Sequence, residues 1–286
     1  MPYLKLAKLN KIDENENKNL KPIAIVKSEK GKQDPMHNSF LYLDLDDKQN
    51  PNKKTKIELE FHQKFEILPT TDPLKRNVFF IAGASGSGKS YITKMVVNLY
   101  AKLWPDRKIF VVSRLDEDET LDSIKSKNII KLDIPSLVET PFDVNNPAFF
   151  QSCFIVDDCD ALPDKNEDKA VQDLIDQISS MGRLHHKKKD EDGKETGQGG
   201  ISLFFITHFL SNYKKSRLIM NEATHYVLYP QSTSSNQLYY VLNKYLGLER
   251  KEILNLKKMG SRWIVVHKNY PQYIIGQYSA RILHQD

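Results

Sequence analysis

The chain has 286 residues, of which 40% are hydrophobic and 28% are charged, and its formal net charge is +5. This length can bury a large core, either as one α/β domain or as a core with an appendage. No apolar stretch is long enough to span a bilayer, no secretory signal opens the chain, and two cysteines are too few for a disulfide framework. A reducing intracellular compartment is therefore expected, and the modest positive charge by itself says little about nucleic acid.

Residues 1–75 are expected to form a β-rich accessory segment, and residues 76–286 the main domain. Short extended runs, "PIAIVKS", "FLYLDLD" and "TKIELEFHQKFEIL", are separated by polar spacers rich in asparagine and lysine. In the third run, Ile57, Leu59 and Phe61 alternate with polar residues, which predicts one half-buried strand.

From Asn77 onward, short apolar runs alternate with helical patterns. Such alternation predicts an α/β fold, with a mostly parallel sheet flanked by helices. The expected strands are 78–83, 108–114, 153–158, 201–208 and 225–230, and the first two helices are 90–104 and 169–183. Two further helices, 236–246 and 249–259, and two strands, 262–268 and 272–278, are expected to follow. The low-complexity stretch 185–200 is expected to be a surface loop.

The segment "GASGSGKS" fits the phosphate-loop (P-loop) pattern G-x-x-x-x-G-K-[ST] at every fixed position. It follows an expected strand and precedes an expected helix, which disfavours the alternative of a glycine-rich turn that binds nothing. Backbone amides of such a loop and the positive end of the helix converge on phosphate oxygens. The residues expected to contact ATP are Gly83, Ala84, Ser85, Gly86, Ser87, Gly88, Lys89, Ser90 and Tyr91. Within this set, Lys89 would reach the β- and γ-phosphates and the Ser90 hydroxyl would bind Mg²⁺.

A second motif, "CFIVDDCD", is an apolar strand that ends in two carboxylates. Asp157 is predicted to orient Mg²⁺, and Asp158 to polarise the attacking water as a general base. The alternative is a solvent-exposed acidic turn after a core strand, and Asp160 is interpreted as structural.

The order of these motifs resembles the FtsK–HerA superfamily of DNA-pumping ATPases. It is most similar to the poxvirus-type genome-packaging ATPases of large DNA viruses and virophages. The matching stretches are "FIVDD", "MGRLHH", "ISLFFITH" and the carboxy-terminal "YLGLERKEILNLKKMGSRWIVVHKNYPQYII". The resemblance covers residues 77–282 and implies a RecA-like (ASCE) P-loop NTPase core.

The resemblance also implies roles for two further side chains. Arg183 would stabilise charge on the transferred phosphoryl group, in its own or a neighbouring subunit's site; the alternative is a helix C-terminal cation. Relatives commonly end the sensor strand in glutamine, whereas this chain has Thr207 and His208. His208 is the predicted γ-phosphate sensor, with Thr207 as the alternative.

By this resemblance, the expected function is a Mg²⁺-dependent ATPase that moves double-stranded DNA, without sequence preference, into a viral capsid. It implies a homo-oligomeric ring, a capsid or portal partner, and a place in the host cytoplasm, virus factory or virion. Three basic clusters could touch DNA phosphates or could simply be solvated: Lys187–Lys189, Lys214 with Lys215 and Arg217, and Lys257 with Lys258 and Arg262. Two alternatives remain: a small-molecule kinase or other NTPase, and an ATP-switched assembly protein that pumps no DNA.

Overall fold

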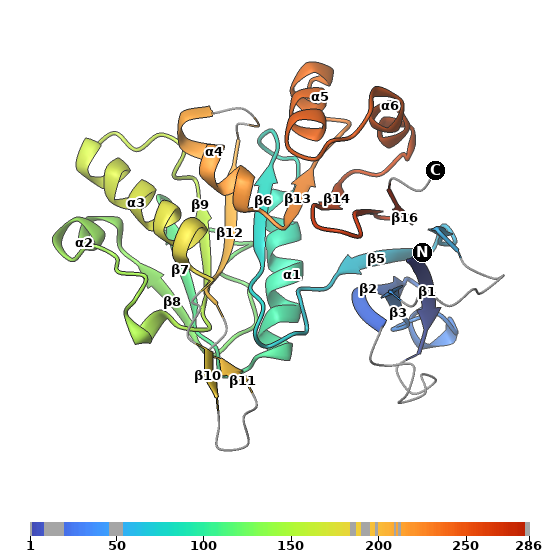
Figure 1. The fold of residues 1–286 in the computed structure, drawn as a ribbon, viewed down its shortest axis with the longest axis horizontal. Helices are drawn as coiled ribbons and strands as arrows, with labels where there is room; N and C mark the ends of the chain where they lie inside the picture. Colours follow the sequence, from blue (N-terminus) through green and yellow to red (C-terminus); the bar gives the residue numbers. More distant parts are fainter. Residues whose placement is uncertain are drawn as a thin grey trace.

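The computed structural model describes residues 2–8, 20–45, 54–183, 187–189, 195–197, 200–208, 210 and 213–283. Residues 187–189, 195–197 and 213–215 are described by their backbone alone. A ten-stranded sheet carries helices on its faces, and a smaller N-terminal sheet lies beside its C-terminal half (Figure 1).

Six neighbouring strands of the large sheet are parallel. Their order is β13 (His225–Leu228), β6 (Val78–Ala82), β12 (Ser202–Thr207), β9 (Cys153–Asp157), β7 (Ile109–Ser113) and β8 (Ile129–Leu132). Because parallel strands end at the same edge of a sheet, the ends of β6, β12 and β9 lie side by side there. The predicted α/β P-loop NTPase core is confirmed, and β8 is a strand that the sequence did not predict.

Four antiparallel strands extend the sheet beyond β13. They are β14 (Ile264–His267), β15 (Tyr273–Gly276), β16 (Ser279–Ile282) and β4 (Lys56–Glu58). The expected pair near the C-terminus is β14 and β15, whereas β16 was not predicted. β4 comes from the N-terminal quarter of the chain, so that quarter contributes a strand to the main sheet.

The helices are α1 (Lys89–Leu103), α2 (Ile134–Glu139), α3 (Lys165–Met181), α4 (Tyr213–Glu222), α5 (Ser235–Lys244) and α6 (Arg250–Lys258), with short 3₁₀ turns at Gly31–Gln33 and Pro147–Phe149. Of these, α2 and α4 were not predicted. In α3, the Asp164 side chain accepts hydrogen bonds from the first free amides of the helix. Val171, Leu174, Ile175 and Ile178 follow at helical spacing and are buried, which fixes the face that packs on the sheet.

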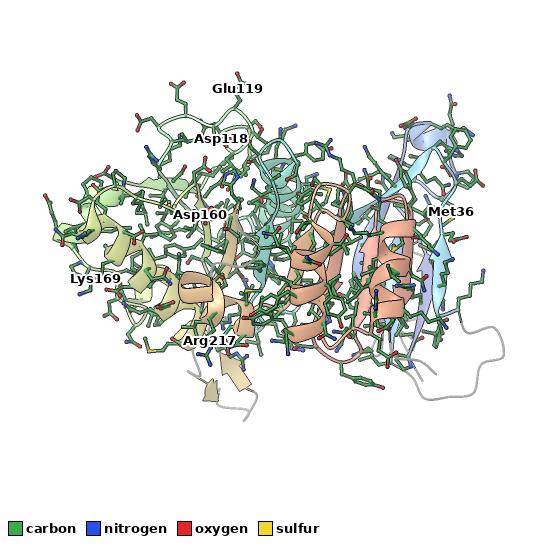
Figure 2. All side chains as sticks on the ribbon, turned by 90° about the horizontal axis from the view of Figure 1, so that it is seen from above. Met36, Asp118, Glu119, Asp160, Lys169 and Arg217 are labelled. Carbon is green, nitrogen blue, oxygen red and sulfur yellow. The ribbon has the colours of Figure 1, made fainter. Side chains whose placement is uncertain are left out.

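Alternate side chains of β6 enter two different hydrophobic cores. Phe80 packs in a cluster with buried residues of α3 to α6, whereas Phe79 packs in a cluster with α1 and with the N-terminal sheet. Seen from above, α3 to α6 form a row along one face of the sheet (Figure 2). The large sheet is therefore covered on both faces.

The N-terminal segment is β-rich, as predicted. Its strands are β1 (Tyr3–Ala7), β3 (Phe40–Asp44), β2 (Leu20–Ser28) and β5 (Gln63–Ile67), in this spatial order and antiparallel throughout. The boundary at residue 75 stays a prediction, while the shared cluster shows that this segment packs on the main sheet.

The prediction of one strand across residues 55–68 is wrong. The run divides into β4 and β5, which belong to different sheets, and Phe61 between them is 88% exposed. The reason lies next to it: His62 Nε2 lies 3.1 Å from Asp34 Oδ2, and Gln63 Nε2 donates to the same oxygen at 2.8 Å. These buried contacts turn the chain away from the strand direction.

The stretch 185–200, predicted to be a surface loop, contains two short strands, while residues 185–186, 190–194 and 198–199 lie outside the described residues. β10 (Lys187–Lys189) and β11 (Glu195–Gly197) pair as an antiparallel hairpin. The dipeptide Asp192-Gly193 is a common hairpin-turn signal that the low-complexity interpretation overlooked. Backbone hydrogen bonds across the ladder satisfy polar groups that a loop leaves to water.

Candidate nucleotide site

The P-loop follows β6 at the carboxyl edge of the parallel strands, and its backbone requires glycine. Gly86 and Gly88 have φ of 71° and 104°, a left-handed region that other residues rarely adopt. A Cβ added to Gly83 would lie 2.6 Å from a ring carbon of Tyr229. The P-loop therefore keeps its shape through two backbone conformations and one close contact.

Lys89 is the first residue of α1, and its side chain is folded back onto the loop. Its Nζ donates to the carbonyl oxygens of Gly83 at 2.9 Å and of Ala84 at 3.2 Å. It also lies 3.2 Å from Nδ1 of His208. Burial lowers the pKa of Lys89, while the nearby aspartates act in the opposite direction.

Asp157 ends β9, next to the strand that precedes His208. The side chain is buried, and Oδ1 accepts a hydrogen bond from the amide of Asp158 at 2.9 Å. Burial is the main cause that raises the pKa of Asp157 to about 7, and the charge of Asp158 adds to it. A cation bound beside Asp157 would therefore stabilise the ionised form of this buried carboxyl group.

Asp158 and His208 face each other across the ends of β9 and β12. Oδ1 of Asp158 lies 2.9 Å from Nε2 of His208. Because Lys89 can only donate, Nδ1 of a neutral His208 accepts from it and Nε2 donates to Asp158. Asp158 has a φ of 53°, so strained backbone directs this side chain toward the histidine.

Asp160 holds the end of β12 in place. Its Oδ1 accepts from the Thr207 hydroxyl at 2.6 Å, and its Oδ2 accepts from the His208 amide at 2.8 Å. The structural interpretation of Asp160 agrees with these contacts. Thr207 is buried against this carboxylate, whereas His208 is exposed at the site.

Six of the nine predicted ATP residues and the predicted Mg²⁺ residues line one cavity of about 270 Å³, whereas Gly83, Ala84 and Ser87 are not among its lining residues. Its walls include Ser85, Gly86, Gly88, Lys89, Ser90, Tyr91, Asp157, Asp158 and His208, together with Thr120 from a loop after β7. Mg²⁺ in phosphate sites is usually held by one or two carboxylates and by the substrate phosphates. Ser90 and Asp157 supply such oxygens here, and the raised pKa of Asp157 marks a group that a cation would stabilise. The donor set therefore fits Mg²⁺.

Two arginines lie at the site without having been predicted there, although Arg262 was named in a basic cluster. Nε of Arg262 donates to the Ser87 carbonyl at 3.0 Å, and Nη2 donates to the Gly86 carbonyl at 3.1 Å. Arg114, directly after β7, lines an adjoining hollow of about 430 Å³ with Asp158 and His208. No local motif marks either residue, because each reaches the site only through the packing of distant strands.

Arg183 is not brought to the P-loop of its own chain. It follows α3 at the opposite edge of the parallel strands, where Nη2 contacts Oε2 of Glu222 at 3.0 Å. The buried Arg76, directly before β6, contacts the same carboxylate at 3.6 Å. In the fold, Arg183 is thus a partly exposed cation paired with α4, and its action in a neighbouring subunit stays a prediction.

The three basic clusters have different surroundings. The side chains of Lys187–Lys189 and of Lys214 and Lys215 lie outside the described residues. Arg217 is exposed on α4, on the face that carries α3 to α6 and away from Asp118 and Glu119 (Figure 2). Arg262 is occupied by the P-loop, so the third cluster is not simply a solvated face.

Neither cysteine forms a disulfide, and both are buried. Burial is the main cause that raises the pKa of the Cys159 thiol to about 12. Across the described residues, no helix combines the length and the apolar character that crossing a membrane requires.

No known family model matches the chain. Protein V3 of Sputnik virophage, described as uncharacterized, is 32% identical over 223 residues, which are 76% of this chain and 82% of V3. Among solved structures, the conjugation coupling protein TcpA of pCW3 is 12% identical with a TM-score of 0.47, covering 91% of this chain and 77% of TcpA. The genome packaging NTPase B204 of Sulfolobus turreted icosahedral virus 2 is 14% identical with a TM-score of 0.42, covering 72% of this chain and 99% of B204. Both structural likenesses are distant. Through its match to V3, the chain belongs to a virophage protein family.

Proposed function

We propose that this protein is a Mg²⁺-dependent ATPase that couples ATP hydrolysis to the movement of double-stranded DNA, packaging a viral genome into a capsid. The observation that carries the proposal is the contact chain from Lys89 through His208 to Asp158, which lies directly over the P-loop. A cation, a polar relay and a carboxylate are thereby held at one edge of the sheet.

Each group has a proposed part in hydrolysis. Lys89 exchanges the carbonyl oxygens of the P-loop for phosphate oxygens when ATP binds. Ser90 and Asp157 would hold Mg²⁺, which when bound would neutralise phosphate charge. Asp158 accepts a proton from the attacking water, and His208 orients that water or the γ-phosphate. Asp160 keeps His208 in register through the His208 amide.

The oligomer is proposed from the position of Arg183. It lies at the edge of the sheet opposite its own P-loop, so it can stabilise phosphoryl transfer only in another subunit. A homo-oligomeric ring supplies that arrangement, and sequence-independent DNA contacts would come from lysine and arginine side chains. We further propose that the ring binds a capsid or portal protein and acts inside the infected host cell.

The proposal is tested by steady-state ATP hydrolysis with and without random-sequence duplex DNA. The wild type should be stimulated several-fold by DNA, and Lys89→Ala should lose at least about a hundredfold in rate, because it loses the phosphate-binding cation. Lys102→Ala, an exposed lysine at the other end of α1, is the matched control and should behave as the wild type. An ATP hydrolysis rate that does not change when DNA is added would favour a kinase or another NTPase. Nucleotide binding without turnover would favour an assembly switch.

The ring and the role of Arg183 are tested by mixing subunits. Arg183→Ala subunits keep an intact P-loop, and Lys89→Ala subunits keep the arginine. If Arg183 acts on a neighbour, mixing two inactive variants should restore part of the activity at hybrid interfaces. Failure of the mixture to exceed either variant alone would remove Arg183 from the proposed mechanism.

A further inference from the structure

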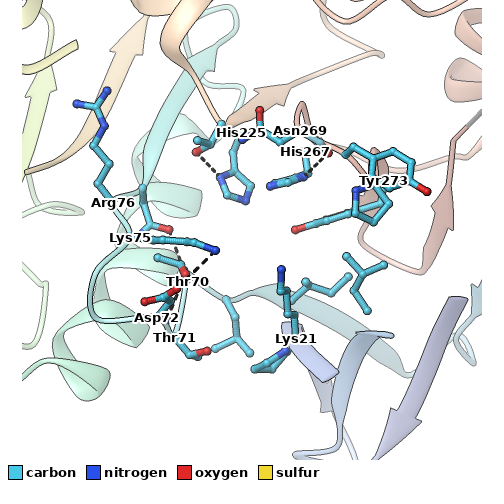
Figure 3. A pocket seen from close by; sticks show the side chains of 18 residues that line it. Lys21, Thr70, Thr71, Asp72, Lys75, Arg76, His225, His267, Asn269 and Tyr273 are labelled. Carbon is cyan, nitrogen blue, oxygen red and sulfur yellow. Dashed lines mark hydrogen bonds and ion pairs between the residues drawn. The ribbon is translucent and has the colours of Figure 1, made fainter. Parts of the chain in front are cut away.

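A second pocket lies at the edge of the sheet opposite the P-loop, between the N-terminal sheet and the starts of β6 and β13 (Figure 3). Its volume is about 290 Å³. One wall is apolar and includes Ile23, Leu43, Leu68 and Tyr273. Nothing in the proposed ATPase cycle uses this space.

The pocket presents positive charge. Lys21 on β2 and Lys75 before β6 direct their ammonium groups into the space (Figure 3). Lys21 has no ion pair within the described part of the chain, and Lys75 has only Asp72, at 3.5 Å. Arg76 also lines the pocket, but its guanidinium points away and binds the carbonyls of α3. Lys21 therefore supplies charge that no described carboxylate pairs with, while Lys75 shares its charge with Asp72, which also lines the pocket.

The pocket also holds a neutral imidazole with a free lone pair. The Thr224 hydroxyl donates to the Val78 carbonyl at 3.0 Å, so it can only accept from Nδ1 of His225, 2.9 Å away. Nδ1 therefore carries the proton, and Nε2 of His225 is an acceptor with no hydrogen bond to any other described residue. Burial keeps the pKa of His225 well below its usual value, so the ring stays neutral. The ring points into the space from the side opposite Lys21 (Figure 3).

Two neighbours complete the polar lining. Asn77 is buried, and its Nδ2 has no hydrogen-bond partner, although its Oδ1 accepts from the Thr70 amide. His267 stacks on Tyr273 and donates from Nδ1 to the Asn269 carbonyl at 3.1 Å. Burial lowers the pKa of His267 to about 4, and the charge of Lys21 acts in the same direction. A buried amide donor without a partner is costly unless a ligand satisfies it.

The geometry points to a binding site for a small phosphate monoester with an apolar organic group. Lys21, Lys75 and Asn77 donate to the anionic oxygens. His225 Nε2 accepts from the remaining P–OH of the singly protonated group, and the apolar wall takes the organic part. A phosphodiester such as the DNA backbone carries no P–OH, and a carboxylate has no hydroxyl donor, so both fit the site less well.

The test is calorimetric titration of the full chain, free of nucleotide, with phenyl phosphate. Because the P-loop also binds phosphates, the titration is run on the wild type, Lys89→Ala, Lys21→Gln and Lys64→Gln. Lys64 is an exposed lysine on β5 and serves as the matched control. Thermal melting of each variant checks that Lys21→Gln, an exposed substitution, folds like the wild type.

At this pocket, the wild type, Lys89→Ala and Lys64→Gln are expected to bind phenyl phosphate alike, whatever the P-loop adds in proteins that keep Lys89. Lys21→Gln is expected to bind it about tenfold more weakly there, because one charged hydrogen bond is lost. Methyl phenyl phosphate, a diester, should also bind about tenfold more weakly than the monoester to the wild type. Binding that disappears in Lys89→Ala and persists in Lys21→Gln would assign the phosphate to the P-loop and overturn the inference. Equal binding of the diester, or no binding at about 10 mM, would overturn it as well.

Discussion

Replacing Asp157 by asparagine should make the nucleotide-free protein more stable while abolishing its activity. Asp157 is 4% exposed, and its pKa rises from 3.8 to about 7, mainly through burial and then through the charge of Asp158. Asparagine removes the buried charge and keeps an oxygen for the Asp158 amide. The stabilisation of Asp157→Asn relative to the wild type should therefore appear only at pH values at which Asp157 is ionised.

The sign follows from proton binding. Below about pH 4, Asp157 is protonated in both the folded and the unfolded chain, so its titration does not change the free energy of unfolding. Between about pH 4 and pH 7 the unfolded chain loses the proton first, and the free energy of unfolding falls as pH rises. Above about pH 7, Asp157 is ionised in both the folded and the unfolded chain, and the full cost of burying its charge lowers the free energy of unfolding.

The rise in pKa corresponds to about 4 kcal/mol, which is an upper bound. The new amide group of asparagine leaves a buried donor without a partner, and this costs about 2 kcal/mol. The expected net gain for Asp157→Asn is therefore about 2 kcal/mol at pH 8, and the variant should lose about 2 kcal/mol at pH 4.

The assay is urea unfolding of both proteins in EDTA at several pH values, and the free energies are compared after linear extrapolation. Adding Mg²⁺ with a non-hydrolysable ATP analogue should stabilise the wild type and not the variant, since the metal carboxylate is gone. A difference between the two proteins that does not change with pH would refute the reasoning, because the effect would then not come from ionisation of Asp157.

Three further substitutions test other contacts. Asp160→Ala removes the acceptor of Thr207 and of the His208 amide, and kcat for ATP should fall about tenfold or more with KM little changed; an unchanged kcat would contradict the positioning role. Arg262→Gln removes two donors from P-loop carbonyls, and ATP affinity in an equilibrium titration should fall about tenfold; unaltered affinity would show that the loop holds its shape without this side chain. Phe61→Ser alters a side chain that is 88% exposed, so the free energy of unfolding should change by less than about 0.5 kcal/mol. A large loss there would contradict the turn between β4 and β5.

Local patterns were sufficient for the parts of the fold that are contiguous in sequence. The P-loop combines fixed spacing with a preceding strand and a following helix, so its place was predictable. Runs such as 153–157 and 202–207 are buried on both faces, and continuous apolar runs are typical of such strands. Periodicity failed at Phe61, because a strand pattern does not reveal that a neighbouring histidine is held by Asp34.

The composition of the site beyond the P-loop was decided by tertiary structure. Asp160 meets the Thr207 hydroxyl across 47 residues, and Arg262 meets the P-loop across 175 residues. Arg183 illustrates the converse, because its motif suggested a catalytic group and the fold places it at the far edge of the sheet. The sequence by itself determined which residues have the chemistry for nucleotide binding, since that chemistry resides in short motifs. The order of strands determined which of them share an edge, because only pairing between distant segments brings their ends together.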